Sequence, residues 1–407
     1  MKPTKAFQPR RVLALLFVVA FAFFSIASSY ALNAQASNNQ LQVWEQSPAY
    51  PFDVLEQSCV ISSSYVYCIG GINSTNSGFS DSSAVYYSQI QGNKSLGTWN
   101  KAPSYPYGVA YQSCATNSTY VYCIAGVNAG SGGSETNVYY AAIQDNGNLS
   151  SWKASASYPA KVYAPSCIIA SGYVYCMGGA PTNATWVYYS QIQSNGDLSS
   201  WKQAPSYPFE VYSQSCTADS GYLYCIGGAD QAGGFANSNS TYFAQIETNG
   251  DLGPWQASPR YPAQVVSESC VASAGYVLCV GGNNPEVGDL SSVYYDQVQN
   301  SGNLSSWHSD PVYPFEIYGQ SCVTSSGYVY CIGGGITTPA SYYVNYVYYA
   351  DLLPSSTSSS VNHATNSTSD ATSGNSIPFT DFAVAATGLV ATIVGVSVVS
   401  YFVKRKP

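Results

Sequence analysis

The sequence contains a stretch with two cysteines nine positions apart that occurs six times. The first copy runs from Gln57-Ser58-Cys59 to Cys68-Ile69-Gly70-Gly71. The other five copies are Gln112–Gly126, Pro165–Gly179, Gln214–Gly228, Glu268–Gly282 and Gln320–Gly334. Together the copies hold all 12 cysteines of the chain. A fixed repeat of this kind predicts one supersecondary unit stacked on copies of itself.

Each cysteine stretch has the pattern of a β-hairpin. In the third copy, Cys167–Ala170 and Tyr173–Cys176 flank Ser171-Gly172, which suits a two-residue turn. Counting outward from that turn, the two cysteines face each other at a non-hydrogen-bonded pair, where the Cα atoms of paired strands are closest. That separation is compatible with a disulfide.

In an exported chain we therefore expect one disulfide in each repeat. Small buried thiols are the alternative, whereas zinc is disfavoured because the cysteine spacing is wrong and the chain has only 2 histidines. The expected disulfides are Cys59–Cys68, Cys114–Cys123, Cys167–Cys176, Cys216–Cys225, Cys270–Cys279 and Cys322–Cys331.

A second hairpin follows the first in each repeat. In the third copy, Val187–Ile192 and Leu198–Trp201 flank Asn195-Gly196, a strong type I′ turn signal. Each repeat thus predicts four short antiparallel strands. Six such units in series predict an all-β fold, a closed six-bladed β-propeller whose blades leave few exposed edges.

The two ends of the repeat region are complementary. The last repeat reaches a third strand at Val347-Tyr348-Tyr349 and ends without a fourth, whereas Leu41–Trp44 is a fourth strand without a repeat of its own. We therefore expect the N-terminal strand to complete the sixth blade.

The N-terminal residues 1–36 are predicted to be a secretory signal peptide. Four basic residues precede the apolar run Val12–Ile26, and small residues follow. Cleavage after Ala31 and cleavage after Ala36 both fit, and an uncleaved signal-anchor helix is the alternative.

The C-terminal residues predict an anchor for the propeller, which we assign to residues 37–353. Residues 354–381 are rich in Ser and Thr and too polar to fold alone, so we expect a stalk. Phe382–Val403 carries no charge and is long enough to span a bilayer, and residues 404–407 form a basic, cytoplasmic tail. The expected location is the cell membrane, with a single pass and the propeller outside.

The charge distribution excludes one class of partner. Between the basic N-terminal residues and the basic tail, six basic residues stand against all 21 acidic ones. A surface of this sign repels phosphate backbones, so we expect no nucleic acid partner.

The repeat resembles the kelch repeat, which has a Gly-Gly pair at a strand end, then a tyrosine-rich strand, then a spaced tryptophan. The resemblance covers Leu41–Leu353, and five copies keep both glycines whereas the second has Ala125-Gly126. It implies a propeller fold. The resemblance does not predict a particular function, because kelch propellers include both binding modules and enzymes.

Two enzymes with kelch propellers can be tested on the residues. Galactose oxidase has a copper site with histidines and a tyrosine crosslinked to cysteine, but this chain has only His308 and His363, and each cysteine has a partner in its own repeat. The kelch-type sialic acid epimerases act on sialates, and a sialate carboxylate favours a clamp of arginine side chains. The propeller has a single arginine, Arg260, and a lone surface arginine is more often structural, so an epimerase is disfavoured.

In a propeller, the loops from the fourth to the first strand and from the second to the third emerge on one face. The second set varies in length here, which is the usual layout of a binding surface. Its segments are Ile72–Ala84, Val127–Asn137, Ala180–Trp186, Ala229–Thr241, Asn283–Ser292 and Gly335–Tyr346.

Residues at aligned positions after each Tyr-Pro pair are predicted to form the rim of the central channel, with carboxylates and tyrosines that suit sugars and peptides. A solvated rim without particular chemistry is the alternative, and carboxylates could also hold Ca²⁺. The candidate ligand-binding residues are Asp53, Glu56, Tyr111, Lys161, Tyr163, Glu210, Tyr212, Glu268, Glu316 and Tyr318.

The expected function is extracellular binding or adhesion, with a carbohydrate or a protein as ligand. A glycan-modifying enzyme needs two carboxylates at a defined separation, such as Glu210 with Glu316 or Asp53, and is the alternative. A purely structural envelope protein is a third possibility. No catalytic residue, metal site or cofactor is assigned.

Eight Asn-x-Ser/Thr sequons fit an exported glycoprotein. They are Asn73, Asn93, Asn117, Asn148, Asn183, Asn239, Asn303 and Asn366.

Overall fold

The computed structural model describes residues 43–352, apart from residues 76–77, 129, 182–184, 231–235 and 338–341. The predicted signal peptide, stalk, membrane segment and cytoplasmic tail lie outside the described residues, as do the sequons Asn183 and Asn366. The described residues form strands and connecting segments without a helix. Within them, no helix has the length and apolar character needed to cross a membrane.

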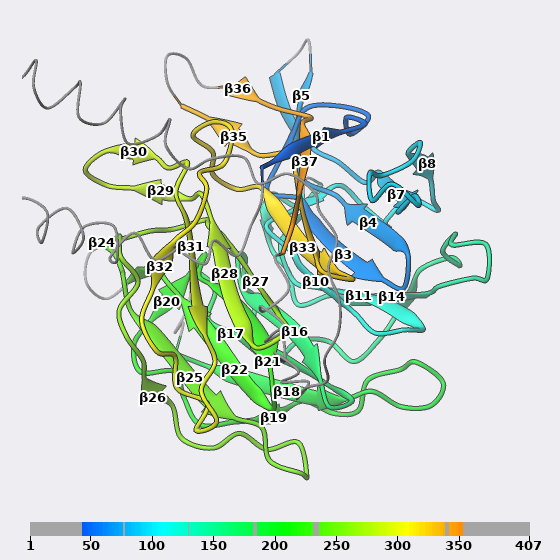
Figure 1. Ribbon diagram of the computed structural model, residues 1–407. Coiled ribbons are helices and arrows are strands. Elements are labelled where there is room, and N and C mark those ends of the chain that lie inside the picture. Colours follow the sequence, from blue (N-terminus) through cyan, green and yellow to red (C-terminus); the bar gives the residue numbers. More distant parts are fainter. Residues whose placement is uncertain are drawn as a thin grey trace, which may run out of the picture. The chain divides into compact units, whose positions relative to one another are not determined.

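Antiparallel four-stranded sheets repeat along the chain, one for each cysteine stretch (Figure 1). The first three are β3 (Ser58–Ser62), β4 (Tyr65–Ile69), β7 (Val85–Gln89) and β8 (Asn100–Lys101); β10 (Ser113–Thr116), β11 (Tyr120–Ile124), β14 (Val138–Ala142) and β15 (Lys153–Ala154); and β16 (Ser166–Ala170), β17 (Tyr173–Met177), β18 (Val187–Gln191) and β19 (Lys202–Gln203). The next three are β21 (Ser215–Asp219), β22 (Tyr222–Ile226), β25 (Thr241–Gln245) and β26 (Gln256–Ala257); β27 (Ser269–Ser273), β28 (Tyr276–Val280), β31 (Val293–Gln297) and β32 (His308–Ser309); and β33 (Ser321–Ser325), β34 (Tyr328–Ile332), β37 (Val347–Asp351) and β1 (Glu45–Ser47).

The last of these sheets takes its fourth strand from the other end of the chain. β1 pairs with β37 in antiparallel register, with Glu45 opposite Tyr349 and Ser47 opposite Val347 (Figure 1, blue beside orange). The two ends of the repeat region are therefore held together by a β-ladder, as the sequence predicts.

The fourth strand of each repeat lies later in the chain than predicted. It follows the tryptophan, as in β19 after Trp201, and the predicted strand Leu198–Trp201 contributes only an isolated bridge from Leu198 to Ile192. The N-terminal strand is displaced in the same way, since β1 begins after Trp44. The physical reason is that the tryptophan serves as a contact between repeats.

Each of these tryptophans packs edge-on against the tyrosine of a Tyr-Pro pair, with ring centroids 4.9–5.1 Å apart. Its indole N–H donates to the carbonyl two residues before that tyrosine, at 2.9–3.3 Å. Trp44 makes the same pair of contacts with Tyr313 and Pro311, far away in the sequence. The contact that joins consecutive repeats therefore also joins the two ends. The pairs are Trp44–Tyr313, Trp99–Tyr50, Trp152–Tyr105, Trp201–Tyr158, Trp255–Tyr207 and Trp307–Tyr261.

The six predicted disulfides are confirmed. In every repeat the two cysteines are direct partners in the first hairpin, as Cys167 and Cys176 are in β16 and β17. Their Cα atoms lie 4.0–4.1 Å apart, as expected for a non-hydrogen-bonded pair.

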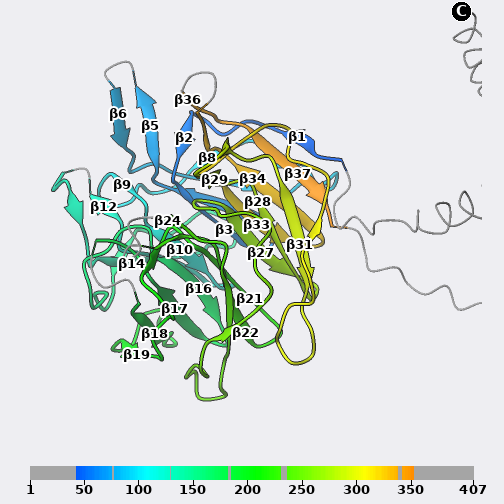
Figure 2. The same ribbon diagram turned by 90° about the vertical axis from the view of Figure 1, so that its left-hand side faces the viewer.

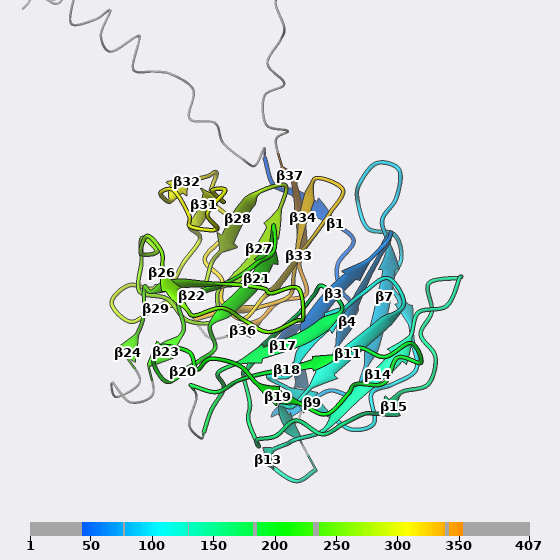
Figure 3. The same cartoon turned by 90° about the horizontal axis from the view of Figure 1, so that it is seen from below.

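The first strands of the sheets contact one another in a closed series around a common centre (Figure 3). β33 contacts both β27 and β3, so the series returns to its start. The serine before each first cysteine makes this contact specific, because its hydroxyl accepts a hydrogen bond from the backbone N–H of the first cysteine in the next repeat, at 2.8–3.0 Å. The hydrophobic core lies between neighbouring sheets, as in the cluster that joins Ile124 to Val174.

A tyrosine of the second strand ties each repeat to the next. Its hydroxyl donates to a carbonyl in the turn before the fourth strand of the following repeat, at 2.7–2.9 Å, as Tyr175 does to Gly250. The fifth repeat has Leu278 at this position. The repeat that follows it receives its fourth strand from the N-terminus, so that turn does not exist there. Leucine thus replaces the tyrosine in the repeat whose neighbour has no turn carbonyl to accept the hydroxyl hydrogen bond.

Tyr175→Phe is expected to lower the free energy of unfolding by about 1–2 kcal/mol, because the buried carbonyl of Gly250 loses its donor. Tyr188→Phe, on a half-buried ring that faces Tyr158, is the control with a smaller expected effect. Thermal or denaturant unfolding measures both. Equal losses would show that the hydroxyl of Tyr175 does not stabilise the contact between repeats.

Smaller strand pairs cover one end of the four-stranded sheets (Figure 2). The segments between second and third strands, predicted as loops, form hairpins in five repeats, and in three repeats the hairpin pairs with a short strand that precedes the cysteine stretch. The bounds are β2 (Val54–Leu55), β5 (Ile72–Thr75) and β6 (Gly78–Asp81); β9 (Val109–Ala110), β12 (Val127–Asn128) and β13 (Gly133–Ser134); β20 (Val211–Tyr212), β23 (Ala229–Asp230) and β24 (Ala236–Asn237); β29 (Asn283–Asn284) and β30 (Gly288–Asp289); and β35 (Gly335–Ile336) and β36 (Tyr342–Tyr343).

Candidate functional site

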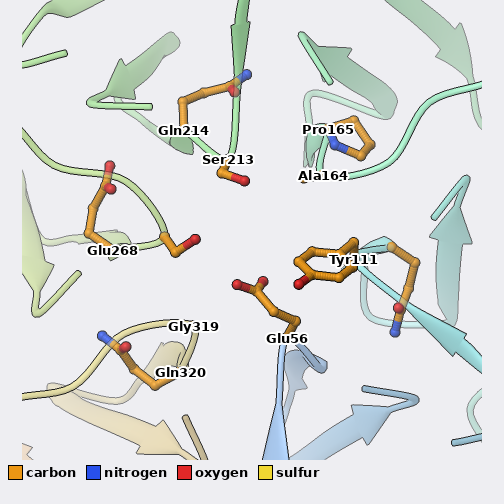
Figure 4. Close-up of a pocket in the computed structure, with 11 residues that line it drawn as sticks. Glu56, Tyr111, Ala164, Pro165, Ser213, Gln214, Glu268, Gly319 and Gln320 are labelled. Carbon is orange, nitrogen blue, oxygen red and sulfur yellow. The ribbon is translucent and has the colours of Figure 1, made fainter. Parts of the chain in front are cut away.

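A cavity of about 100 Å³ lies where all six repeats meet (Figure 4). Two consecutive positions of the repeat line it. The first, which we call the inner ring, comprises Glu56, Tyr111, Ala164, Ser213, Ser267 and Gly319. The second, which we call the glutamine ring, comprises Gln57, Gln112, Pro165, Gln214, Glu268 and Gln320, all lining the cavity except Gln57.

The backbone of the inner ring is the same in all six repeats. Every member has a positive φ, between 51° and 61°. Each backbone N–H donates to the carbonyl of the preceding member, at 2.8–3.3 Å, and the N–H of Glu56 closes the cycle on the carbonyl of Gly319. The fold therefore requires the left-handed conformation at this position, but it does not require a particular side chain.

The inner ring holds five different residue types at its six positions, with serine in both the fourth and the fifth repeat. Glycine, as at Gly319, suits a left-handed backbone best, and larger residues there cost on the order of 1 kcal/mol. Glu56 and Tyr111 nevertheless hold this conformation, and in Figure 4 both point toward the centre of the cavity. Strained positions of this kind cluster at functional sites.

Glu56 is the one acidic side chain of the inner ring. Glu56 is half-buried, and the desolvation of its carboxyl in the cavity raises its pKa to about 7, against the smaller effect of a hydrogen bond from the Ser267 side chain. Burial also raises the pKa of Tyr111, and the nearby Glu56 raises it further. A carboxyl with a pKa near neutrality in a cavity can act as a binding group or as an acid–base group.

Three tyrosines from consecutive repeats, which we call the tyrosine arc, extend in series from this cavity: Tyr111, Tyr163 and Tyr212. The ring of Tyr111 contacts that of Tyr163 at 6.0 Å, and Tyr163 contacts Tyr212 at 6.4 Å, both edge-on. On the other side of Glu56, burial raises the pKa of Tyr318 to about 12, with smaller contributions from Tyr343, Asp289 and Glu56. Aromatic faces from several repeats thus lie near one carboxyl group.

The glutamine ring holds neighbouring repeats together. Four of its members donate a side-chain N–H to the carbonyl that follows the second cysteine of the preceding repeat, at 2.6–2.9 Å, as Gln112 does to Ile69. Glu268 stands at the same position and is 6% exposed, and neither carboxyl oxygen accepts a hydrogen bond of ordinary geometry. The backbone N–H groups of Ser215 and Glu268 are close enough only to lower the pKa of this carboxyl slightly. A carboxylate cannot donate, whereas a protonated carboxyl can take the place of the glutamine amide.

The remaining member, Pro165, coincides with the incomplete Gly-Gly pair of the second repeat. A Cβ at Gly70 would lie 2.4 Å from the backbone carbonyl of Val109 and 2.8 Å from the amide nitrogen of Gln112 in the next repeat, and only the second of these contacts depends on the glutamine. At the aligned position of the second repeat, Ala125 is followed in the next repeat by Pro165, which has no such amide. Alanine is therefore found where the glutamine is absent.

Glu268→Gln is expected to stabilise the protein at alkaline pH. Burial raises the pKa of Glu268 from 4.5 to about 8, so the folded state keeps a proton that the unfolded state has released, and stability falls as the pH rises between these values. At pH 8 the substitution should raise the free energy of unfolding by about 4 kcal/mol, and the gain should vanish near pH 4. Thermal unfolding across this pH range, with the exposed Glu316→Gln as control, measures the effect. Parallel pH profiles for wild type and Glu268→Gln would contradict it.

The ten predicted rim residues fall into two groups, six at or around the cavity and four away from its lining. Glu56, Tyr111 and Glu268 line the cavity, and Tyr163, Tyr212 and Tyr318 lie around it. The other four precede the inner ring by three residues and are not among the lining residues; Glu210 is half-buried and the other three are exposed. They are Asp53, Lys161, Glu210 and Glu316.

Sequence reasoning missed Ala164, Ser213, Ser267 and Gly319, which complete the inner ring. The signal was available, because each of the four stands two residues before a Ser-Cys pair that opens a cysteine stretch. The predicted residues were chosen by chemical type at four different aligned positions, and this obscured the single position that faces the cavity.

Arg260 and the described sequons lie away from the cavity lining. Arg260 donates to the side chain of Asn239 at 2.8 Å. Asn303 accepts a bond from Ser258 at 2.7 Å. The other described sequons are Asn73 in β5 and Asn93, Asn117 and Asn148 in or beside hairpin turns. Among the residues that the structure describes, no group of three or more His, Cys, Asp or Glu side chains is placed to hold a metal ion.

No protein-family model matches the chain, and no curated protein matches it in sequence. Among solved structures, 665 chains match. One, entitled "Structure of YjhT", is a kelch-type β-propeller that aligns with a TM-score of 0.59 and 13% identity, over 74% of this chain and 96% of its own. At this identity the likeness shows the fold alone. The chain is thus an all-β protein of repeated four-stranded sheets that fits a β-propeller.

Proposed function

We propose that this protein is a cell-surface binding module, built on a closed six-bladed propeller of the kelch type, that takes an extracellular protein or carbohydrate at its central cavity. Three features support six blades in a closed ring: the cycle of inner-ring backbone bonds, the cycle of serine–cysteine bonds, and the tryptophan contacts. The Gly-Gly pairs and the likeness to YjhT support the kelch type.

The observation that carries the function is the inner ring. Six equivalent backbone positions hold five different residue types, and the two largest side chains, Glu56 and Tyr111, occupy strained backbone and point into the cavity. Structural needs alone would favour glycine at this position. A converging set of a carboxyl, a phenol and hydroxyls is the chemistry of a ligand site.

The disulfides support an extracellular location, because such bonds persist in oxidising compartments. In this proposal residues 1–36 direct export, residues 354–381 hold the propeller off the membrane, and residues 382–403 anchor it with the tail in the cytoplasm.

One observation favours a second candidate, a glycan-modifying enzyme. The pKa of Glu56, raised to about 7, would suit a general acid or base. However, the carboxylates proposed for a catalytic pair, Asp53, Glu210 and Glu316, do not line the cavity. The binding role therefore stands first.

Filling the cavity tests the proposal. Ser213→Phe combined with Ser267→Phe places two rings in the cavity at positions that already hold side chains in the same backbone conformation. Binding to a panel of glycans and extracellular proteins should fall at least about tenfold, which is 1.4 kcal/mol. The triple variant Asp53→Asn, Glu210→Gln, Glu316→Gln is the control and should bind as wild type does.

Unchanged binding by the filled variant would remove the cavity as the ligand site. Loss of binding in the triple variant alone would move the site to the outer carboxylates. Conversion of a glycan by wild type, lost in Glu56→Gln, would favour the enzyme.

A further inference from the structure

We propose that the cavity receives the ammonium group of a lysine side chain presented by a partner protein. This inference rests on the proposed binding function and names the group that is bound. Charge, size, donor geometry and the tyrosine arc each support it.

The charge around the cavity favours a cation. None of the described residues that line it is basic, and Glu56 lies at its centre. The six segments between second and third strands contain no lysine, arginine or histidine, but they contain five acidic residues: Asp81, Glu135, Asp230, Glu286 and Asp289. An anionic ligand, such as a sialate or a phosphate, would meet the Glu56 carboxyl here. Lys161, three residues before Ala164, is exposed and is not among the lining residues.

The size of the cavity favours a slender group. Pockets that enclose a small-molecule ligand measure about 300–1,000 Å³, whereas this cavity measures about 100 Å³. A sugar ring would not enter it whole. An ammonium on an unbranched arm would, while the rest of the partner lies on the strand pairs above.

The arrangement of acceptors suits an ammonium more than a guanidinium. The carboxyl of Glu56 and the hydroxyls of Tyr111 and Ser213 lie around the centre of the cavity (Figure 4). Ser267 also lines the cavity, and its side chain is hydrogen-bonded to Glu56. An ammonium has three donors that point in different directions, so it can bond to a ring of acceptors, whereas a guanidinium is planar and matches one carboxylate face-on.

The tyrosine arc would supply the remaining attraction. Tyr111, Tyr163 and Tyr212 form a continuous series of edge-on contacts beside Glu56. Aromatic faces attract a cation by about 0.5–2 kcal/mol, and they cover the methylene groups of a lysine arm. The exposed Val287 and Tyr342 on the strand pairs of two repeats offer apolar contacts to the body of a protein ligand.

The experiment titrates the full-length protein with the capped peptide Gly-Gly-Lys-Gly-Gly and with the same peptide carrying Nε-acetyl-lysine. Acetylation removes the charge and keeps the arm, so it should weaken binding at least about tenfold. Glu56→Gln, which keeps the shape of the side chain, should weaken binding of the unmodified peptide by a similar factor. Glu316→Gln removes an exposed charge outside the cavity lining and should change the dissociation constant less than about twofold.

The pH dependence adds a second readout. Lysine stays charged up to about pH 10, whereas the pKa of Glu56 is about 7. Affinity for the lysine peptide should therefore rise about tenfold from pH 6 to pH 8, and Glu56→Gln should abolish the rise.

Equal binding of the two peptides, or equal binding by wild type and Glu56→Gln, would overturn the inference. So would a glucosamine oligomer that binds where the lysine peptide does not. If the lysine peptide fails while a panel ligand binds and is lost in the cavity-filled variant, the lysine inference is wrong and the proposed binding function stands. If the cavity-filled variant also binds that panel ligand as wild type does, the lysine inference and the proposed binding at the cavity are both wrong.

Discussion

The hydrogen-bonded cycle of the inner ring is the constraint on which the site depends. Each of its six residues must adopt a left-handed backbone to donate to the preceding repeat, and the N–H of Glu56 completes the cycle on Gly319. Because backbone atoms alone close the cycle, the side chains are free to vary. The same cycle turns those side chains toward one point, so a repetitive scaffold produces one asymmetric cavity.

The contacts between repeats explain why the sequence is so regular elsewhere. The serine before each first cysteine, the tryptophan after the turn and the tyrosine of the second strand all bond to a neighbouring repeat. Their exceptions are informative for the same reason. Leu278 replaces a tyrosine that would have no turn to reach, and Pro165 accompanies the alanine of the second repeat.

The fold could be predicted further than the site. Period-two alternation places Cys167 opposite Cys176, so the hairpins, the disulfides and the closing N-terminal strand followed from residue spacing. The fourth strands were placed too early because the tryptophan signal marks a contact between repeats, not a strand. The site needed the direction of each side chain. Asp53 and Glu56 are only three residues apart, yet one is exposed and the other faces the cavity, because a left-handed residue redirects the chain.

A carboxyl that is poorly hydrated and ready to accept a cation is the central claim of this account. The most direct test is an NMR titration of the Glu56 carboxyl in the free protein and with saturating lysine peptide. The account predicts a pKa of about 7 in the free protein, because the cavity withholds water from the carboxylate, and a clear decrease when the ammonium binds. A pKa near the ordinary value for glutamate that does not move with the peptide would contradict it.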